Sequence, residues 1–349
     1  MTAGLDDSEG TPVFADQAIA LFVHATRRDP GPAARDVGAE RSRRAQRERA
    51  RVRPPGPELH AVDDVSADGV PARLYRPSNG DGDRAGAAGA GGAGGAGGAG
   101  PIDLTIGRGT VVYLHGGHWT IGDLESHDRA CRRLAAATGL AVLAVDDRRA
   151  PEHPWPAAVD DAVAAVRWAA RATRPARLVV AGDSAGGNLA TLCCLRLRGE
   201  RGPLPDLQVL LYPNTDLTLS QPSVRAFGTG WGLSAEEVAW GAENWVPDPA
   251  RRADREVSPL FEPDLAGCPA ALIVTAEFDP LRDEGELYAR RLAAAGVAVR
   301  ARREAGMIHG FLTLDTLSPA AAAAGERVFA DLVDLLGEDG HEEEGSDEG

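Results

Sequence analysis

Short apolar runs alternate with longer segments of helical periodicity along most of the chain. The runs are apolar at consecutive positions, which is typical of strands that helices cover on both faces. They lie at residues 111–114, 141–145, 178–181, 208–212 and 271–275, and segments with helical periodicity lie at residues 129–138, 157–171, 188–198 and 284–295. This alternation predicts the α/β class, with a mostly parallel central sheet flanked by helices.

Three further segments have patterns of their own. Residues 13–26 have the apolar spacing of a short amphipathic helix, and residues 33–51 are rich in Arg, Ala and Glu, which suits a polar helix or a mobile arm. Residues 62–77 alternate as a strand does and end at Pro77. Residues 216–259 interrupt the rhythm with several Trp, Gly and Pro residues, and we interpret them as an insertion above the carboxyl edge of the sheet.

Two segments contain few large apolar side chains that could pack in a core. Residues 79–100 contain the Gly/Ala tract AGAAGAGGAGGAGGAG, for which we expect a flexible surface loop. Because strand-like sequence lies on both sides of it, we interpret the tract as an expanded hairpin connection within one domain; the alternative is an interdomain linker. Residues 341–349 are nearly all Glu, Asp and Gly, so we expect a disordered acidic tail over 338–349.

Charge and composition narrow the class of protein. The formal net charge of -15 at pH 7 would repel phosphate backbones, so we expect no nucleic-acid partner. We expect no signal peptide and no membrane span, since the start of the chain has no basic and apolar regions and no apolar run is long enough. The four cysteines form no CxxC pair, which favours a cytoplasmic location. A homodimer remains open.

Residues 182–186 read G-D-S-A-G and match the pattern G-x-S-x-G. The pattern predicts a sharp strand-to-helix turn that exposes the Ser184 hydroxyl, and the small residues Gly182 and Gly186 permit such a turn. The alternative is that Ser184 only caps the following helix. An apolar run before the motif and a helical pattern after it favour a catalytic nucleophile.

A serine hydroxyl needs a base to take its proton, and the base needs a third group to hold it. Where this turn occurs, the chain order is serine, acid, histidine. After Ser184 the sequence has only His309 and His341, and His341 lies in the acidic tail. His309 follows the last strand-like run, 297–302, so we predict that it is the base, with a surface-loop histidine or a helix cap as the alternative.

Asp279 is the predicted acid. It follows the apolar run 271–275, and a carboxylate at the carboxyl end of a late strand can hold the second ring nitrogen of the base. Asp283 and Glu277 remain alternatives, and Asp279 itself alternatively caps the next helix.

The segment after residues 111–114 contains two glycines that suit an oxyanion hole. Gly116 and Gly117 let backbone amides approach a substrate oxygen, and we predict that they donate from one side and Ala185 from the other. The alternative is an ordinary glycine-rich turn.

Three nearby histidines, His115, His118 and His127, raise the question of a metal. We expect no metal and no cofactor, because His115 and His118 lie on a loop that leaves a strand and no nearby cysteine or carboxylate completes a site.

These motifs, in this order, resemble the hormone-sensitive-lipase-like esterases of the α/β-hydrolase superfamily. The matching segments are HGG at 115–117, APEHPWPAAVDDA at 150–162, GDSAGGNLA at 182–190, DPLRDEGELYARRL at 279–292 and HGF at 309–311. The resemblance implies an α/β-hydrolase domain over 60–337, covered by a helical cap built from residues 1–55 and the insertion at 216–259. It also implies that His115 is structural. The sequence departs from the family pattern at His118, where a third glycine is common, and at Asp147, where an aromatic residue is common.

The motifs and the resemblance together predict a serine hydrolase that cleaves short-acyl carboxylic esters of small molecules through an acyl-enzyme. Two alternatives remain. One is a hydrolase that removes N-acetyl or N-formyl groups from a small metabolite. The other is a ligand-binding protein without catalysis, although such proteins tend to lose the base and His309 is present here.

Overall fold

A single eight-stranded sheet forms the centre of the computed structural model, which describes residues 12–77 and 108–338. The strand order is β1-β2-β4-β3-β5-β6-β7-β8. The strands are β1 (Ala61–Ala67), β2 (Val70–Arg76), β3 (Thr110–Leu114), β4 (Ala141–Val145), β5 (Leu178–Asp183), β6 (Leu207–Leu211), β7 (Ala270–Phe278) and β8 (Val299–Ile308). Strands β3 to β8 are parallel to their neighbours, as the consecutive apolar positions predict.

Strands β1 and β2 form an antiparallel hairpin, so the strand-like pattern predicted over 62–77 corresponds to two strands. Asp68 and Gly69 connect them with φ of 54° and 91°, the two positive angles that a tight two-residue hairpin loop requires. Strand β2 then pairs antiparallel with β4 at the edge of the parallel strands.

The same pairing corrects the interpretation of residues 79–100. A hairpin connection would place β2 beside β3, but β4 lies between these two strands. Both strands nevertheless belong to one sheet. The Gly/Ala tract itself and the acidic tail at 339–349 lie outside the described residues, so their predicted flexibility stays a prediction.

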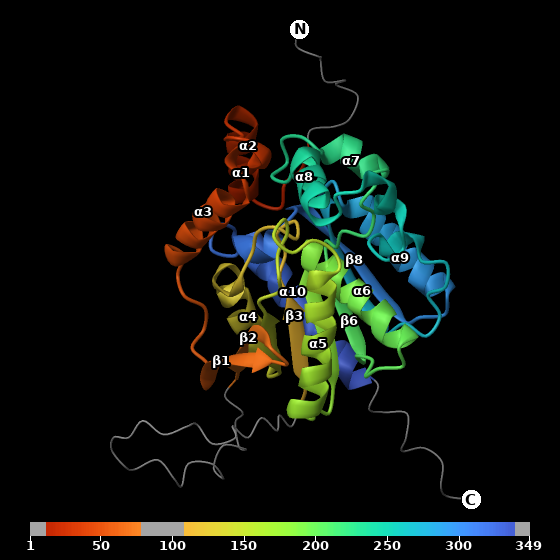
Figure 1. The fold of residues 1–349 in the computed structure, drawn as a ribbon. Coiled ribbons are helices and arrows are strands. Elements are labelled where there is room, and N and C mark those ends of the chain that lie inside the picture. Colours follow the sequence, from red (N-terminus) through yellow and green to blue (C-terminus); the bar gives the residue numbers. More distant parts are fainter. Residues whose placement is uncertain (1–11, 78–107, 339–349) are drawn as a thin grey trace, which may run out of the picture.

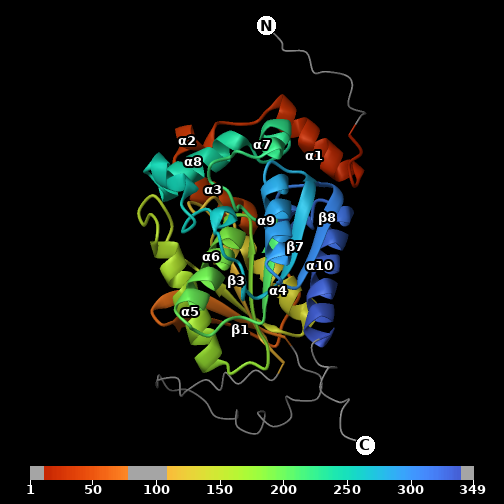
Figure 2. The same ribbon diagram turned by 90° about the vertical axis from the view of Figure 1, so that its right-hand side faces the viewer.

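Helices cover both faces of the sheet, as Figures 1 and 2 show. The helices after the first strands are α4 (Leu124–Thr138), α5 (Ala157–Ala172), α6 (Ala185–Gly199), α7 (Pro222–Phe227), α8 (Ala235–Trp245), α9 (Arg282–Ala294) and α10 (Pro319–Glu338). Short 3-10 helices lie at η2 (Pro249–Ala253), η3 (Pro259–Phe261) and η4 (Phe311–Leu314). Within the described ranges, no helix combines the length and apolar character needed to cross a membrane.

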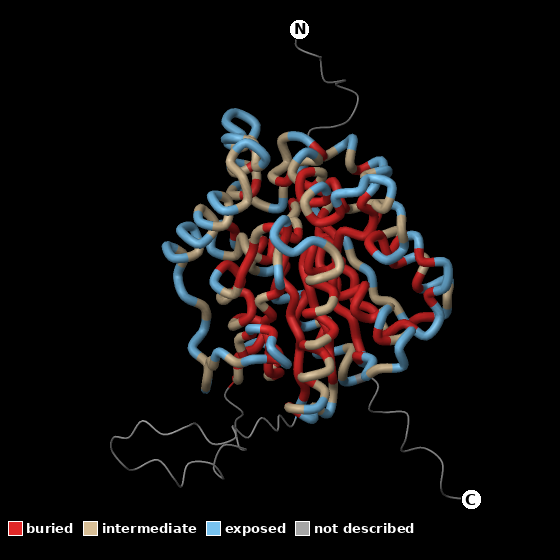
Figure 3. The backbone as a smooth tube through the Cα atoms, viewed as in Figure 1, coloured by how far each residue is buried: buried red, intermediate tan, exposed pale blue. Residues whose placement is uncertain are grey.

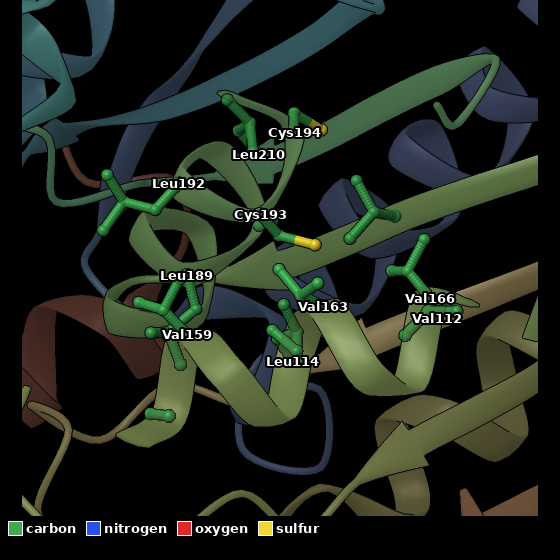
Figure 4. Packing of buried hydrophobic residues seen from close by; sticks show 14 of the residues in the cluster. Val112, Leu114, Val159, Val163, Val166, Leu189, Leu192, Cys193, Cys194 and Leu210 are labelled. Carbon is green, nitrogen blue, oxygen red and sulfur yellow. The ribbon is translucent and has the colours of Figure 1, made fainter. Parts of the chain in front are cut away.

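Successive residues of β3 show how the two layers arise. Val112 and Leu114 pack in one cluster with side chains of α5, α6 and α9, whereas Val111 and Tyr113 pack in a second cluster with side chains of α4 and α10. Figure 3 shows buried chain running through the centre with exposed chain around it, and Figure 4 shows the packing of α5 and α6 side chains against β3 and β6. Side chains alternate across a strand, so an apolar residue at every position supplies both layers.

Residues 17–51 are mostly helical and lie near one end of the sheet, beside α7 and α8 (Figure 2). They form α1 (Gln17–Arg28), α2 (Ala34–Val37) and α3 (Ala39–Arg51). Arg43 Nη2 of α3 donates to the Ala150 carbonyl at 2.7 Å, and Arg35 of α2 pairs with Glu236 and Glu243 of α8. Of the two predictions for residues 33–51, the polar helix is therefore correct.

We expect Leu143→Ala to lower the free energy of unfolding by about 2–5 kcal/mol, because Leu143 of β4 is fully buried and the smaller side chain leaves a cavity. Leu317→Ala is the matched control. Leu317 is 46% exposed, so this change should shift stability by only about 0.5 kcal/mol. Urea unfolding followed by fluorescence measures both, and equal losses would contradict the central place of β4.

Candidate active site

Ser184 lies at the turn between β5 and α6 with φ of 55° and ψ of -120°, a conformation that residues with side chains rarely adopt. Gly182 and Gly186 on either side are packed against backbone. A Cβ on Gly186 would lie 2.0 Å from the Leu114 carbonyl oxygen, and one on Gly182 would lie 2.2 Å from the Gly186 carbonyl oxygen. Only glycine fits at both positions, and together they hold the serine in the strained turn that the sequence predicts.

The structure brings together the three residues predicted to react. His309 Nε2 lies 2.9 Å from Ser184 Oγ, and His309 Nδ1 lies 2.8 Å from Asp279 Oδ2. Asp279 is fully buried and follows β7, while His309 follows β8, so neighbouring parallel strands deliver both side chains to the same edge. The ring of Tyr212 packs edge-on against the His309 ring at 4.8 Å between centroids, which restricts the imidazole further.

The other two acids considered from sequence have different partners. Glu277 Oε2 accepts a hydrogen bond from the Gly306 amide, and Asp283 Oδ2 accepts one from the Ser223 amide. Asp279 combines two contacts, because its Oδ1 accepts from the Leu281 amide while Oδ2 faces His309. Asp279 does not cap the next helix, because α9 begins at Arg282 with Leu281 as its N-cap.

The predicted oxyanion donors need one correction. The Gly116 amide donates to Asp183 Oδ1 at 2.9 Å, so its hydrogen is not directed at a substrate. Across residues 12–77 and 108–338, the amides of Gly117, His118 and Ala185 have no acceptor. Gly117 has φ of 129°, and a Cβ there would lie 2.2 Å from the Ile121 carbonyl oxygen. The loop after β3 is therefore tight, as the glycines predict. Its amides without an acceptor belong to Gly117 and His118 instead of Gly116 and Gly117.

Asp183 is a structural residue that the sequence analysis missed, although it stands within the G-x-S-x-G motif. Its carboxylate accepts from the Tyr113 hydroxyl at 2.9 Å and from the Gly116 amide, and it lies 3.3 Å from His127 Nε2. Burial alone would raise the pKa of Asp183, but His127, Tyr113 and the Gly116 amide hold it below its ordinary value. One anion thus ties the nucleophile turn to the loop after β3.

Each of the three histidines considered for a metal has another contact. His127 faces Asp183, and His115 lies 3.0 Å from the Gly116 carbonyl oxygen through Nδ1 and 3.4 Å from Asp147 through Nε2. The two rings stack at 5.6 Å. Burial raises the pKa of Asp147, the residue where the family commonly has an aromatic. In the part of the chain that the structure describes, no group of three or more His, Cys, Asp or Glu could hold a metal ion.

His118 packs against α8 and lines the site. A Cβ on Gly241 of α8 would lie 2.4 Å from the His118 Cβ, so that helix can approach only because it carries glycine there. Burial lowers the pKa of His118 to about 4, with His309 acting in the same direction and Glu237 acting against it. The imidazole is therefore neutral at pH 7.

A cavity of about 310 Å³ opens onto Ser184 and His309. Its walls come from the loop after β3, from the N-terminal helices and from the segment that carries α8. The lining residues include Phe22, Gln46, Arg49, Arg53, Gly117, His118, Leu233 and Glu237. A larger groove of about 510 Å³ near Trp155 and Arg196 contains none of the three reacting side chains, so we assign the chemistry to the smaller cavity.

The site has the geometry of a serine hydrolase on an α/β-hydrolase sheet, because the fold brings together Ser184, His309 and Asp279. Comparison with known proteins agrees. A family model described as the alpha/beta hydrolase fold matches residues 111–313, more than half of the chain. The chain belongs to this family.

Curated relatives are similar over most of their length. The carboxylic ester hydrolase LipN of Mycobacterium tuberculosis is 42% identical over 294 residues, which cover 80% of this chain and 72% of that protein. The ethyl acetate hydrolase of Pseudomonas putida is 37% identical over 254 residues, which cover 71% of this chain and 73% of that protein.

A solved structure gives the same result for the fold. A thermostable esterase from Pseudomonas putida ECU1011 superposes with a TM-score of 0.79 at 30% identity and covers 94% of this chain and 99% of that one. The predicted fold and the predicted membership of an esterase family of α/β-hydrolases are confirmed.

We expect Gly186→Ala to lower the thermal unfolding midpoint by several degrees, because the new methyl group collides with the Leu114 carbonyl and something must move. Gly199→Ala, in the same helix, is the control. A Cβ at Gly199 meets nothing within 4 Å, so this change should leave the midpoint unchanged or raise it slightly. Differential scanning fluorimetry measures both, and equal midpoints would contradict the close packing of the turn.

Proposed function

We propose that the protein is a serine hydrolase that cleaves short-acyl carboxylic esters, with Ser184 as nucleophile, His309 as base and Asp279 as the acid that holds the base. The observation that carries the proposal is the continuous chain of contacts from Ser184 Oγ through both ring nitrogens of His309 to Asp279, at the floor of an open cavity. The carboxylic ester hydrolases among its relatives support the same bond type.

The proposed reaction has two halves. Ser184 Oγ attacks the ester carbonyl while His309 Nε2 takes its proton, and the same nitrogen then protonates the departing alkoxide. This leaves an acyl group on Ser184. Water then attacks the acyl-enzyme with His309 again as base, releasing the acid and restoring the serine. Asp279 accepts from Nδ1 throughout, which keeps Nε2 as the nitrogen that faces the serine and stabilises the imidazolium between steps.

We propose the amides of Gly117, His118 and Ala185 as the donors that stabilise the oxyanion. They lie on the loop after β3 and at the N-terminus of α6, and none has an acceptor among the described residues. Amides fixed before the reaction starts need no reorganisation when charge develops, and removing one such donor typically costs roughly 100-fold to 1000-fold in turnover.

Two features support a short acyl chain. The cavity of about 310 Å³ is at the small end of the range for ligand sites, and helices from two segments line it. One relative is named an ethyl acetate hydrolase, whose substrate has a two-carbon acyl group. We propose that α1, α2 and α3 with the 216–259 segment act as a cap over a catalytic domain at 60–337.

The alternative that acts on N-acetyl or N-formyl amides keeps the same residues and differs only in the bond. We favour esters because the named relatives are ester hydrolases, and a panel of matched acetate esters and acetamides compares the two. A ligand-binding role without catalysis is less well supported, because Ser184 and His309 are within hydrogen-bonding distance.

We also propose a cytoplasmic location, which the four buried cysteines support because none is paired in a disulfide and a reducing compartment keeps them so. The homodimer left open by the sequence stays a prediction, which light scattering on the purified protein measures.

Ser184→Ala should abolish hydrolysis of 4-nitrophenyl acetate and butyrate, because the proposed nucleophile is gone. It should also abolish covalent labelling by a fluorophosphonate, which reacts with activated serines. Spectrophotometric assay and in-gel detection measure the two effects. Unchanged labelling of the variant would rule out Ser184.

Asp279→Asn should lower kcat by roughly four orders of magnitude. The neutral amide does not keep His309 Nδ1 protonated as the carboxylate does, and it does not stabilise the imidazolium. Asp283→Asn is the control, since that carboxylate bonds the Ser223 amide instead of the base. Ester hydrolysis by the two variants discriminates between the acids; a larger loss in Asp283→Asn would reverse the assignment.

A further inference from the structure

The wall of the cavity formed by the N-terminal helices carries positive charge. Arg49 lies in the last turn of α3 and Arg53 just beyond it, and both line the cavity that contains Ser184 and His309. Neither position was identified from sequence as part of the site. In a protein with a net charge of -15, these two arginines concentrate positive charge on one wall of the cavity that contains Ser184.

Two arginines of α3, Arg43 and Arg47, are paired, whereas Arg49 and Arg53 are not. Arg43 pairs with Glu152 at 2.6 Å, and Arg47 pairs with Asp123 at 2.6 Å. Over residues 12–77 and 108–338, neither Arg49 nor Arg53 forms an ion pair or a side-chain hydrogen bond. Their donors therefore remain available to a ligand in the cavity.

The surroundings of Arg53 contain too little negative charge to neutralise it. The carboxylate that acts on it is Asp315, but Asp315 already lies 2.7 Å from Arg129 and 3.3 Å from Arg133. Burial lowers the pKa of Arg53, and the charges of Arg49 and Arg129 add to this effect. An anion in the cavity would relieve this excess of positive charge.

The backbone around Arg53 is held in place before any ligand arrives. The Arg53 amide donates to the Ala50 carbonyl at 3.2 Å, and Arg129 Nη1 donates to the carbonyls of Pro54 and Pro55. Gly56 packs on α4, because a Cβ there would lie 2.8 Å from Arg132 Cβ. A fixed backbone lowers the entropy cost of binding by the arginine.

The C-terminal end of a helix dipole is negative and favours a cation in the last turn, which partly explains why an arginine stands at position 49. It does not account for Arg53, which lies after the helix and is half-buried in the cavity wall. Glu237, also in the cavity lining, carries the opposite charge and is bonded to Ser234 at the start of α8. Asp183 also lines the cavity, but its carboxylate is buried and binds Tyr113 and the Gly116 amide. The lining thus offers an anion two cationic neighbours, Arg49 and Arg53, and two carboxylates that already have partners.

We propose that the preferred substrates are esters that carry a carboxylate a few bonds from the scissile carbonyl, and that Arg53, assisted by Arg49, binds this carboxylate. The guanidinium group presents paired donors that match a carboxylate, and such charge-assisted bonds are stronger than neutral ones. This inference rests on the proposed ester hydrolysis and adds the substrate class.

The test compares neutral and anionic esters of matched size. On the acyl side, 4-nitrophenyl butyrate is compared with the mono-4-nitrophenyl ester of succinate. On the alcohol side, phenyl acetate is compared with 4-carboxyphenyl acetate. Arg53→Gln, Arg49→Gln and the double variant are assayed beside Arg44→Gln, a control on α3 whose side chain is exposed and does not line the cavity.

Arg53→Gln should lower kcat/KM for one anionic ester about tenfold more than for its neutral partner, mainly through a higher KM, as expected for the loss of a bond between charged groups. The double variant should lose more, and Arg44→Gln should not change the ratio. Added NaCl should raise KM for the anionic ester only. The pair that responds assigns the carboxylate to the acyl or the alcohol side.

An anionic-to-neutral ratio that is the same in the wild type, the double variant and Arg44→Gln, for both pairs, would overturn the inference. If the neutral esters are hydrolysed in that case, the ester hydrolase proposal stands and only the substrate class fails. If wild-type protein hydrolyses neither neutral ester, the proposed function itself fails. Equal thermal unfolding midpoints show that the variants are folded.

Discussion

The close contact between the Ser184 turn and the loop after β3 is the constraint on which the site depends. Gly186 allows the turn to lie against the Leu114 carbonyl, and the buried Asp183 carboxylate binds the Gly116 amide across the same contact. Two adjacent parallel strands, β3 and β5, deliver these segments to one edge. The arrangement is rigid because a strained serine is fixed on both sides by backbone that has no room to relax.

Much of the fold follows from sequence because its central strands are buried on both faces. The run predicted at 141–145 coincides with β4, and the runs at 178–181 and 271–275 lie within β5 and β7. The β1–β2 hairpin was missed, although Asp68-Gly69 is a typical signal for a two-residue loop, because strand-like sequence lies on both sides of it. The place of β4 between β2 and β3 depends on long-range pairing that no local pattern specifies.

In the candidate site, too, some residues could be predicted from the sequence and others could not. Ser184, Asp279 and His309 were selected by their places after strands, and the structure brings them within hydrogen-bonding distance. The role predicted for the Gly116 amide was wrong, because the motif does not reveal that Asp183 accepts its hydrogen. Arg49 belongs to a segment that reads as a polar helix or a mobile arm, and Arg53 follows that segment. Their position at the cavity depends on how α3 packs against the rest of the chain.

The antiparallel pairing of β2 with β4 determines at which edge of the sheet the connection from β2 to β3 is attached. Tyr75 near the end of β2 pairs with Val142 near the start of β4, and Thr110 at the start of β3 pairs with Ala141. The connection from β2 to β3 is therefore attached at the amino edge of the parallel strands, whereas Ser184 and His309 follow their carboxyl ends. Insertions between Pro77 and Arg108 can vary in length during evolution, or accept a fused domain, at the opposite edge of the sheet from the reacting groups.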